Sequence, residues 1–220
     1  GVKGGGSIAS SACCPAGTYW IGGSSECTDC AAGKYNDEEG KTVCTDCAKG
    51  TYNDEEGSTA ETDCTDCAAG KYNDQEGRTA CANCIKGKYN DQLGSTAEAN
   101  CTECVAGKYN DQLGGTAEEA CTNCTKGKYN GVSGSAAEQA CTNCVKGKYN
   151  DQLGSTAEAN CTECVAGKYN EQLGSTAETA CTNCAMGKYN GVSGSAAEQA
   201  CTNCTKGKYN DELGSTMETD

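Results

Sequence analysis

Cysteine is the residue type best placed to do chemistry in this chain, because 22 of its 220 residues are cysteine and none is histidine. Twenty of the cysteines form C-x-x-C pairs, each followed by the same x-x-G-x-Y-N element, so the chain is a tandem repeat with a period of about 20 residues. Cysteines in this pattern could be disulfide partners, zinc ligands or redox centres. The pairs are Cys27/Cys30, Cys44/Cys47, Cys64/Cys67, Cys81/Cys84, Cys101/Cys104, Cys121/Cys124, Cys141/Cys144, Cys161/Cys164, Cys181/Cys184 and Cys201/Cys204.

Two disulfide schemes suit the repeat. Consecutive repeats could pair, with bridges such as Cys27–Cys44 and Cys30–Cys47, which gives a structural period of about 40 residues. Alternatively, the second cysteine of each pair could bond the first cysteine of the next, which gives a ladder with one bridge per repeat. A bridge within one C-x-x-C is disfavoured, because such pairs are usually redox-active.

A longer period favours the ladder. Residues 101–160 and 161–220 match at about 50 of 60 positions, so the duplicated unit is three repeats. Three is not a multiple of two, so each duplication would put a two-repeat bridging scheme out of phase, whereas the ladder is unaffected. The expected ladder uses Cys14, Cys27, Cys30, Cys44, Cys47, Cys64, Cys67, Cys81, Cys84, Cys101, Cys104, Cys121, Cys124, Cys141, Cys144, Cys161, Cys164, Cys181, Cys184 and Cys201.

The ladder leaves two cysteines over, Cys13 and Cys204. The partner of Cys204 would fall near position 221, so the chain could be a fragment of a longer array. The other interpretation is an intermolecular bond from Cys204 to Cys13 or Cys14 of another copy. Head-to-tail contacts of that kind build open filaments.

Metal binding is the rival to disulfides. The cysteines 27/30/44/47 and 64/67/81/84 have C-x2-C-x13-C-x2-C spacing, close to that of a four-thiolate zinc site. The other repeats would need equally good sites, so zinc is disfavoured. Acidic runs at residues 37–39 and 54–56 and the Asn90-Asp91 pair offer calcium ligands, but none has EF-hand spacing. Turn capping by Asn and Asp explains the same residues. We expect no cofactor, with calcium left open.

Catalysis is not expected. The chain has no His to act as an imidazole base, and no G-x-S-x-G, H-E-x-x-H or phosphate-loop motif. A net charge of −14 argues against nucleic acid, whose phosphates bind Lys and Arg. No apolar run is long enough to span a membrane.

The repeats also contain sites for sugars. Four Asn-Cys-Thr sequences are candidate N-glycosylation sites, and in each the middle residue is a cysteine whose bridging could hinder the modification. Coincidence of the repeated string is the other interpretation. The acceptors would be Asn100, Asn123, Asn160 and Asn203.

The elements that position the cysteines must be short. In each repeat G-K-Y-N predicts a strand, with glycines such as Gly107 and Gly127 supplying a positive φ or a close backbone approach. Asn130-Gly131 and Asn190-Gly191 predict type I′ turns. The segment before the next cysteine pair would then complete a hairpin. The tyrosine of each repeat is expected to stack on its neighbours as a ladder.

Composition restricts how such a chain can fold. It has no Phe, one Trp and a mean hydropathy of −0.66, so no repeat can bury an ordinary apolar core. Disulfides at this density persist in oxidising compartments, which predicts secretion or surface display. We expect an extended solenoid or rod of small disulfide-rich repeats, built from short irregular β-hairpins with little helix. The array would cover residues 13–220, after a flexible Gly/Ser-rich arm at residues 1–12.

The segment CCPAGTYWIGGSSECTDCAAGKYND, residues 13–37, resembles the ephrin-receptor-like cysteine-rich repeat and the wider growth-factor-receptor cysteine-rich modules. It is also similar to protist cysteine-rich surface antigens. The resemblance implies an extracellular disulfide-repeat architecture and says little about activity. Only Pro15 stands where that family often has a proline after its cysteine, and the repeats are more alike than those of a ligand-binding receptor.

These observations predict an extracellular structural repeat protein, a subunit of a filament, appendage or surface coat. Its partners would be other copies of itself, arranged head-to-tail or laterally, and glycans. A cell-surface antigen or adhesion module is the alternative, and a metal-binding cysteine array is the second alternative.

Overall fold

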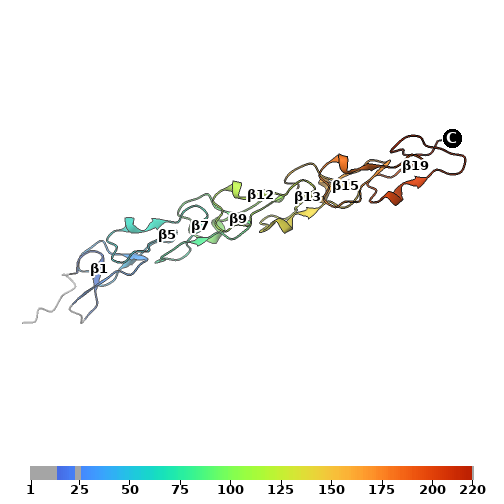
Figure 1. The fold of residues 1–220 in the computed structure, drawn as a ribbon. Helices are drawn as coiled ribbons and strands as arrows, with labels where there is room; N and C mark the ends of the chain where they lie inside the picture. Colours follow the sequence, from blue (N-terminus) through green and yellow to red (C-terminus); the bar gives the residue numbers. More distant parts are fainter. Residues whose placement is uncertain (1–13, 23–25, 220) are drawn as a thin grey trace, which may run out of the picture. The chain divides into compact units, whose positions relative to one another are not determined.

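The computed structural model describes residues 14–22 and 26–219, and in them the chain forms two-stranded antiparallel hairpins with very little helix. Figure 1 draws their strands as short arrows. The strands pair as β1 (Thr18–Trp20) with β2 (Cys27–Asp29), β3 (Lys34–Tyr35) with β4 (Thr45–Asp46), β5 (Thr51–Tyr52) with β6 (Thr65–Asp66), β7 (Lys71–Tyr72) with β8 (Ala82–Asn83), β9 (Lys88–Tyr89) with β10 (Thr102–Glu103), β11 (Lys108–Tyr109) with β12 (Thr122–Asn123), β13 (Lys128–Tyr129) with β14 (Thr142–Asn143), β15 (Lys148–Tyr149) with β16 (Thr162–Glu163), β17 (Lys168–Tyr169) with β18 (Thr182–Asn183), and β19 (Lys188–Tyr189) with β20 (Thr202–Asn203).

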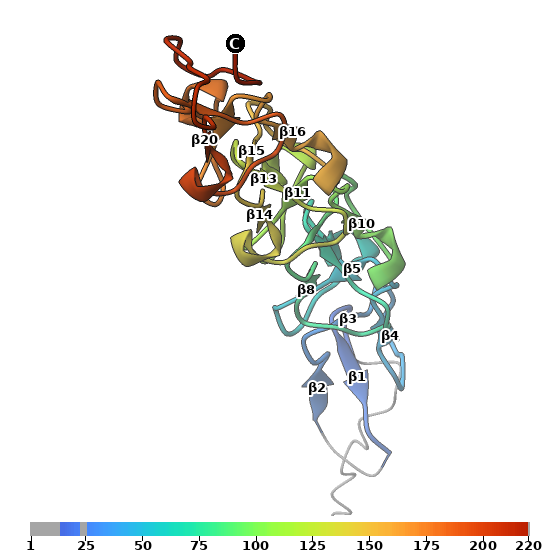
Figure 2. The same cartoon turned by 90° about the vertical axis from the view of Figure 1, so that its right-hand side faces the viewer.

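The only helical elements in the described residues are single 3-10 turns, visible in Figure 2 as short coiled ribbons. Each precedes the first cysteine of a pair. Such a turn stays short because the loop before it contains glycine, which disfavours helix. The cysteine after it adopts an extended backbone and forms a disulfide, so the helical geometry ends there. The turns are η2 (Glu61–Asp63), η3 (Glu98–Asn100), η4 (Glu118–Ala120), η5 (Glu138–Ala140), η6 (Glu158–Asn160), η7 (Glu178–Ala180) and η8 (Glu198–Ala200).

The chain divides into two compact units. One comprises residues 1–102 and 112–120, and the other comprises residues 103–111 and 121–220. Both units repeat the same hairpin, so one hairpin from each is enough to describe the local fold.

A hairpin spans two sequence repeats. The Lys-Tyr strand of one repeat pairs with the two residues that lie between the cysteines of the next repeat. In the second unit Lys128 faces Asn143 and Tyr129 faces Thr142; in the first unit Lys71 faces Asn83. Because each hairpin takes its strands from two repeats, a single repeat is not an independent folding unit.

The interior contains almost no aliphatic carbon. In the described residues the buried apolar side chains are all cysteines, and the buried polar side chains are asparagines and serines. Aliphatic side chains such as Leu113 and Leu153, both 59% exposed, point to solvent instead. The prediction of disulfide-stapled repeats of short hairpins with little helix is confirmed. The predicted arm, residues 1–12, lies outside the described residues.

The predicted type I′ turns are wrong. Such a turn needs positive φ at both central residues, but no non-glycine residue in the described chain has positive φ, and Gly131 and Gly191 are not among the glycines that do. The positive φ of that loop falls at Gly134, with φ 69°. Asn130 keeps a negative φ, and its backbone N–H donates to the carbonyl of Ser155 in the next repeat.

Candidate functional site

The recurring feature of this structure is the contact between successive repeats, and the disulfide is its covalent part. The second cysteine of each pair bonds the first cysteine of the next, with Cα–Cα distances from 5.5 to 5.8 Å. The bridges are Cys14–Cys27, Cys30–Cys44, Cys47–Cys64, Cys67–Cys81, Cys84–Cys101, Cys104–Cys121, Cys124–Cys141, Cys144–Cys161, Cys164–Cys181 and Cys184–Cys201.

Three sequence spacings occur within this one ladder, and the first bridge, Cys14–Cys27, joins residues 13 apart. The bridges Cys30–Cys44 and Cys67–Cys81 join residues 14 apart, whereas most later bridges join residues 17 apart. The Cα–Cα distances are the same in both sets. The three extra residues of the longer loops are therefore absorbed away from the bridge, where the later repeats form their 3-10 turn.

Cys204 is the free cysteine of the described residues, and it is partly exposed. Cys13, the other cysteine expected outside the ladder, lies outside the described residues. The structure therefore presents one thiol that could react with another chain.

The backbone adds a fixed set of hydrogen bonds to each bridge. Gly127 N–H donates to the carbonyl of Asn150 at 2.7 Å, and Gly154 N–H donates to that of Cys124 at 2.9 Å. The same two bonds recur in the first unit, from Gly70 to Asn90 at 2.7 Å and from Gly94 to Cys67 at 2.8 Å. These bonds tie the turn after one cysteine pair to the loop of the following repeat.

The glycine of G-x-Y makes room for this contact. Gly127 has φ 80°, and a Cβ at that position would overlap the carbonyl oxygen of Gly174, two repeats further along. Gly107 stands in the same relation to Gly154. Both expected roles of this glycine, positive φ and close backbone approach, are thus present together.

The residue that sequence reasoning undervalued is the asparagine after the tyrosine. Asn150 is 1% exposed, and its Nδ2 donates to the carbonyl of Lys128 in the preceding repeat at 3.1 Å and to Ser155 Oγ at 2.8 Å. Its Oδ1 accepts the backbone N–H of Gln152 at 3.0 Å. Turn capping was expected of this residue, but its burial and its bond to the neighbouring repeat were not.

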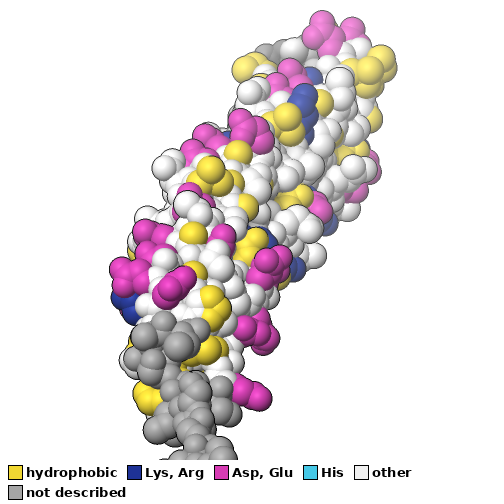
Figure 3. Space-filling model, turned by 90° about the vertical axis from the view of Figure 1, so that its left-hand side faces the viewer, with side chains coloured by type: hydrophobic (Ala, Val, Ile, Leu, Met, Phe, Trp, Pro, Cys, Tyr) yellow, Lys and Arg dark blue, Asp and Glu magenta, His cyan; other side chains and the backbone are white. Residues whose placement is uncertain are grey.

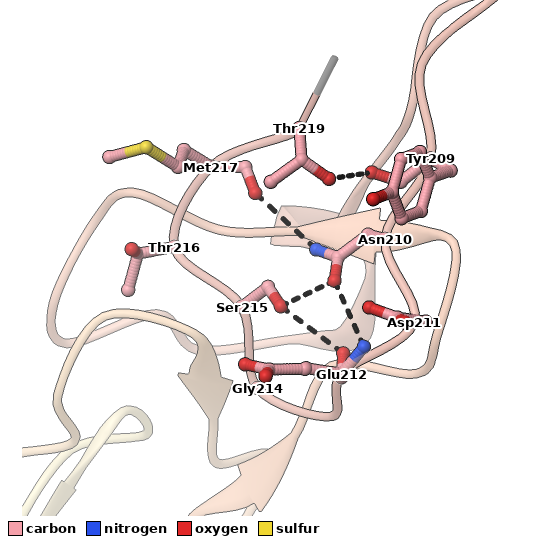
Figure 4. Close-up of a pocket in the computed structure, with 9 residues that line it drawn as sticks. All are labelled: Tyr209, Asn210, Asp211, Glu212, Gly214, Ser215, Thr216, Met217 and Thr219. Atoms are coloured by element: carbon pink, nitrogen blue, oxygen red, sulfur yellow. Dashed lines mark hydrogen bonds between the residues drawn. The ribbon is translucent and has the colours of Figure 1, made fainter.

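Figure 4 shows the corresponding asparagine of the last repeat, where the serine bond has the opposite direction. Asn210 Oδ1 accepts bonds from the Ser215 hydroxyl at 2.6 Å and the Glu212 N–H at 3.1 Å. Nearby, Thr219 Oγ1 donates to the carbonyl of Tyr209 at 2.7 Å. The recurrence of Asn in all ten G-x-Y-N elements was the available signal, because a turn cap alone can also be Asp or Ser.

Tyrosine lies less deeply than asparagine. The described tyrosines from Tyr19 to Tyr189 are half-buried, and Tyr209 is 57% exposed. Their stacking as a ladder stays a prediction.

Charged side chains lie on the outside of the repeats, beside exposed aliphatic side chains such as Leu113 and Val132. Lys128, in β13, pairs with Glu138 in η5 at 2.9 Å, and Lys188 pairs with Glu198 in the same way at 3.1 Å. Figure 3 shows acidic side chains on the face drawn, with fewer Lys and Arg side chains between them. Exposed pairs of this kind add little stability.

In the part of the chain that the structure describes, three side chains have clearly displaced pKa values. Backbone and side-chain hydrogen bonds from Thr205 lower the pKa of Glu218. A hydrogen bond to Glu38 raises the pKa of Lys41. Partial burial, with the charges of Glu61 and Asp37, raises the pKa of Tyr35. All three lie on the surface contacts of the repeats and are not gathered into one site.

The residues considered for metals lie in other roles. Every cysteine of the two possible zinc quartets is bonded in a disulfide, so neither quartet offers thiolate ligands. Within residues 14–22 and 26–219 no group of three or more acidic or cysteine side chains is placed to hold a metal ion. The acidic run at residues 37–39 is exposed.

The four candidate glycosylation sites are all exposed, and they occupy two kinds of position. Asn100 and Asn160 end the 3-10 turns η3 and η6, whereas Asn123 and Asn203 lie in the strands β12 and β20.

The bridged hairpins define a class of protein, the extracellular-type cysteine-rich repeat modules. Within that class, residues 17–64 and 61–101 match the model of a family described as tyrosine-protein kinase ephrin type A/B receptor-like. These residues are similar to ephrin receptor-like cysteine-rich repeats, and the later repeats share their motif and their ladder of bridges. The similarity to protist antigens is not shown.

No curated protein is similar enough to this chain to count as a relative. None of the helices in the described residues has the length and apolar character needed to cross a bilayer. The dense disulfides and the receptor-like module indicate a secreted or surface location.

Proposed function

We propose that this array is a structural module of the cell surface or extracellular space, in which bridged repeats hold a fixed local geometry. The supporting observation is that one disulfide and the same recurring pattern of backbone bonds join successive repeats. Each repeat depends on its neighbours for burial, as in other repeat proteins. A module of this kind supplies spacing and resistance to proteases, and needs no reactive centre.

Peptide mapping without reduction tests the proposal. The secreted chain should yield cross-linked peptides for bridges such as Cys144–Cys161, and should resist protease until a reductant is added. Stoichiometric metal bound by free thiolates, or a mixture of bridging patterns, would count against a structural role.

A second candidate is a covalent filament subunit, and the free thiol of Cys204 favours it. A bond from Cys204 to a cysteine of another copy would join chains end to end. Under oxidising conditions, electrophoresis without reductant should then show a series of multimers that collapses with the Cys204→Ser variant. A monomer alone in both samples would rule out the covalent filament.

A further inference from the structure

The four Asn-Cys-Thr sequences differ in what surrounds their two reacting side chains. N-linked glycosylation needs the Asn amide nitrogen and the hydroxyl of the following Thr, so both groups must be available. All four asparagines are exposed, so exposure alone does not separate them.

The first pair of sites is free at both groups. Asn100 Oδ1 accepts the N–H of Ala97 at 3.0 Å, which fixes the carboxamide by its oxygen and leaves Nδ2 without a partner among the described residues. Asn160 is held in the same way, by Ala157 N–H at 3.0 Å. Thr102 and Thr162, which complete these sites, are exposed and use no side-chain hydroxyl bond within the described chain.

At Asn123 the asparagine packs against the next repeat. Asn123 lies in β12 opposite Lys108, and a Cβ on Gly154 would lie 2.9 Å from Asn123 Oδ1, so the side chain packs over the next repeat's loop. Cys124, the middle residue of this Asn-Cys-Thr sequence, uses both of its backbone polar groups: its N–H donates to the carbonyl of Gly107, and its carbonyl accepts the N–H of Gly154.

At Asn203 the hydroxyl of the site is occupied. Thr205 Oγ1 lies 3.0 Å from Glu218 Oε2, and the Thr205 N–H donates to the same carboxylate at 2.8 Å. Asn203 itself is paired with Lys188 in the hairpin of β19 and β20. A sugar transferase would have to break this contact and open the strand.

We propose that Asn100 and Asn160 are acceptor sites for an N-linked glycan, and that the fold disfavours Asn123 and Asn203. The Nδ2 atom forms a bond to the anomeric carbon of a lipid-pyrophosphate-linked oligosaccharide and loses one proton. The carbon–oxygen bond to pyrophosphate breaks, and the lipid pyrophosphate leaves with the electron pair. The inference rests on the cell-surface or extracellular location proposed above.

The repeats themselves supply matched variants. The residue equivalent to Asn100 in η2 is Asp63, whose Oδ2 accepts the N–H of Ala60 at 3.0 Å. The equivalent residue in η4 is Ala120. Asn100→Asp and Asn160→Asp therefore keep the cap and remove the acceptor. Ala120→Asn adds an acceptor before Cys121 and Thr122 in the same geometry. Val145→Thr completes a site at Asn143, whose Oδ1 packs against Gly174 as Asn123 packs against Gly154.

The test is secretion from a eukaryotic cell, enzymatic glycan release in heavy-oxygen water, and mass spectrometry of each site. Asn100 and Asn160 should have several-fold higher occupancy than Asn123 and Asn203, and each Asn→Asp variant should lose one glycan. Ala120→Asn should gain one, and Val145→Thr should gain none.

Three results would overturn the inference: occupancy of Asn123 comparable to that of Asn100, a glycan on the Val145→Thr variant without one on Ala120→Asn, or no glycan at any site. Peptide mapping of the same sample separates the two proposals. Intact bridges without glycans overturn the acceptor sites alone, whereas missing bridges overturn the structural module as well.

Discussion

At the scale of single residues, the repeat is held by one buried amide. Asn150 combines the bond to Lys128, the bond to Ser155 and the turn cap at Gln152 in one side chain that is 1% exposed. A buried donor or acceptor that loses its partner costs about 1–3 kcal/mol. The position therefore tolerates neither an apolar residue nor a charge.

Replacing Asn150 by Ala should lower the free energy of unfolding by about 1–3 kcal/mol, because the Lys128 carbonyl and the Gln152 N–H lose their partner. Denaturant unfolding of the oxidised protein measures the loss. Leu153→Ala, at a side chain 59% exposed in the same loop, is the control and should change stability by less than about 0.5 kcal/mol. Equal effects of the two variants would contradict the role given to Asn150.

Glycine supplies the second prediction, because two positions with the same φ differ in their surroundings. Gly127 has φ 80° and lies against Gly174, whereas Gly187 has φ 78° and would meet nothing within 4 Å. Gly187→Ala should cost only the left-handed backbone strain, about 1–2 kcal/mol.

Gly127→Ala should cost that amount plus about 1–3 kcal/mol for the overlap with the neighbouring loop. Thermal or denaturant unfolding of both variants separates the two contributions. A Gly187→Ala variant as unstable as Gly127→Ala would show that the close approach is not important for stability.

At the scale of elements, the sequence predicts the strands well and the loops less well. The Lys-Tyr strand was predicted from the G-K-Y-N element, and the ladder of bridges was favoured over paired repeats because the duplicated unit is three repeats. The Asn130-Gly131 turn was predicted wrongly, since its dihedral angles depend on a hydrogen bond to Ser155 in the next repeat. Only the recurrence of asparagine hinted at its burial, because one of the groups that Asn150 bonds, the carbonyl of Lys128, belongs to the preceding repeat.

The contact between the β20 segment and Glu218 should depend on pH. The hydrogen bonds from Thr205 lower the pKa of Glu218, so this contact contributes order above the ordinary Glu pKa and loses it as pH falls through the lowered value. The amide proton of Thr205 should shift in an NMR titration with a midpoint below that of an unperturbed Glu. Glu218→Gln should remove this titration, and a midpoint at or above the ordinary value would contradict the assignment.

At the scale of the whole molecule, stability should be the sum of neighbouring contacts. Each repeat is bonded to its neighbours by one disulfide and the same backbone bonds, so damage to one bridge should stay local. The ladder also lacks an aliphatic core that could compensate for a missing bridge, since the described buried apolar residues are all cysteines.

Removing one bridge tests this locality. Replacing both Cys144 and Cys161 by Ser opens one loop without leaving a free thiol, and the loss of a native disulfide typically costs about 2–5 kcal/mol. Trypsin under non-reducing conditions should then cut after Lys146 and Lys148 in the opened loop, while lysines of distant loops such as Lys71 stay protected.

Mass spectrometry of the fragments locates the cuts, and Cys204→Ser is the control, because Cys204 belongs to no bridge and its loss should leave the pattern unchanged. Cuts in every loop of the double variant would mean that the repeats unfold as one cooperative body. An uncut loop would mean that the backbone bonds, such as that from Gly147 N–H to the Asn170 carbonyl at 2.8 Å, hold the repeat without its disulfide. Local cutting alone agrees with a structure in which each bridge stabilises its own pair of repeats.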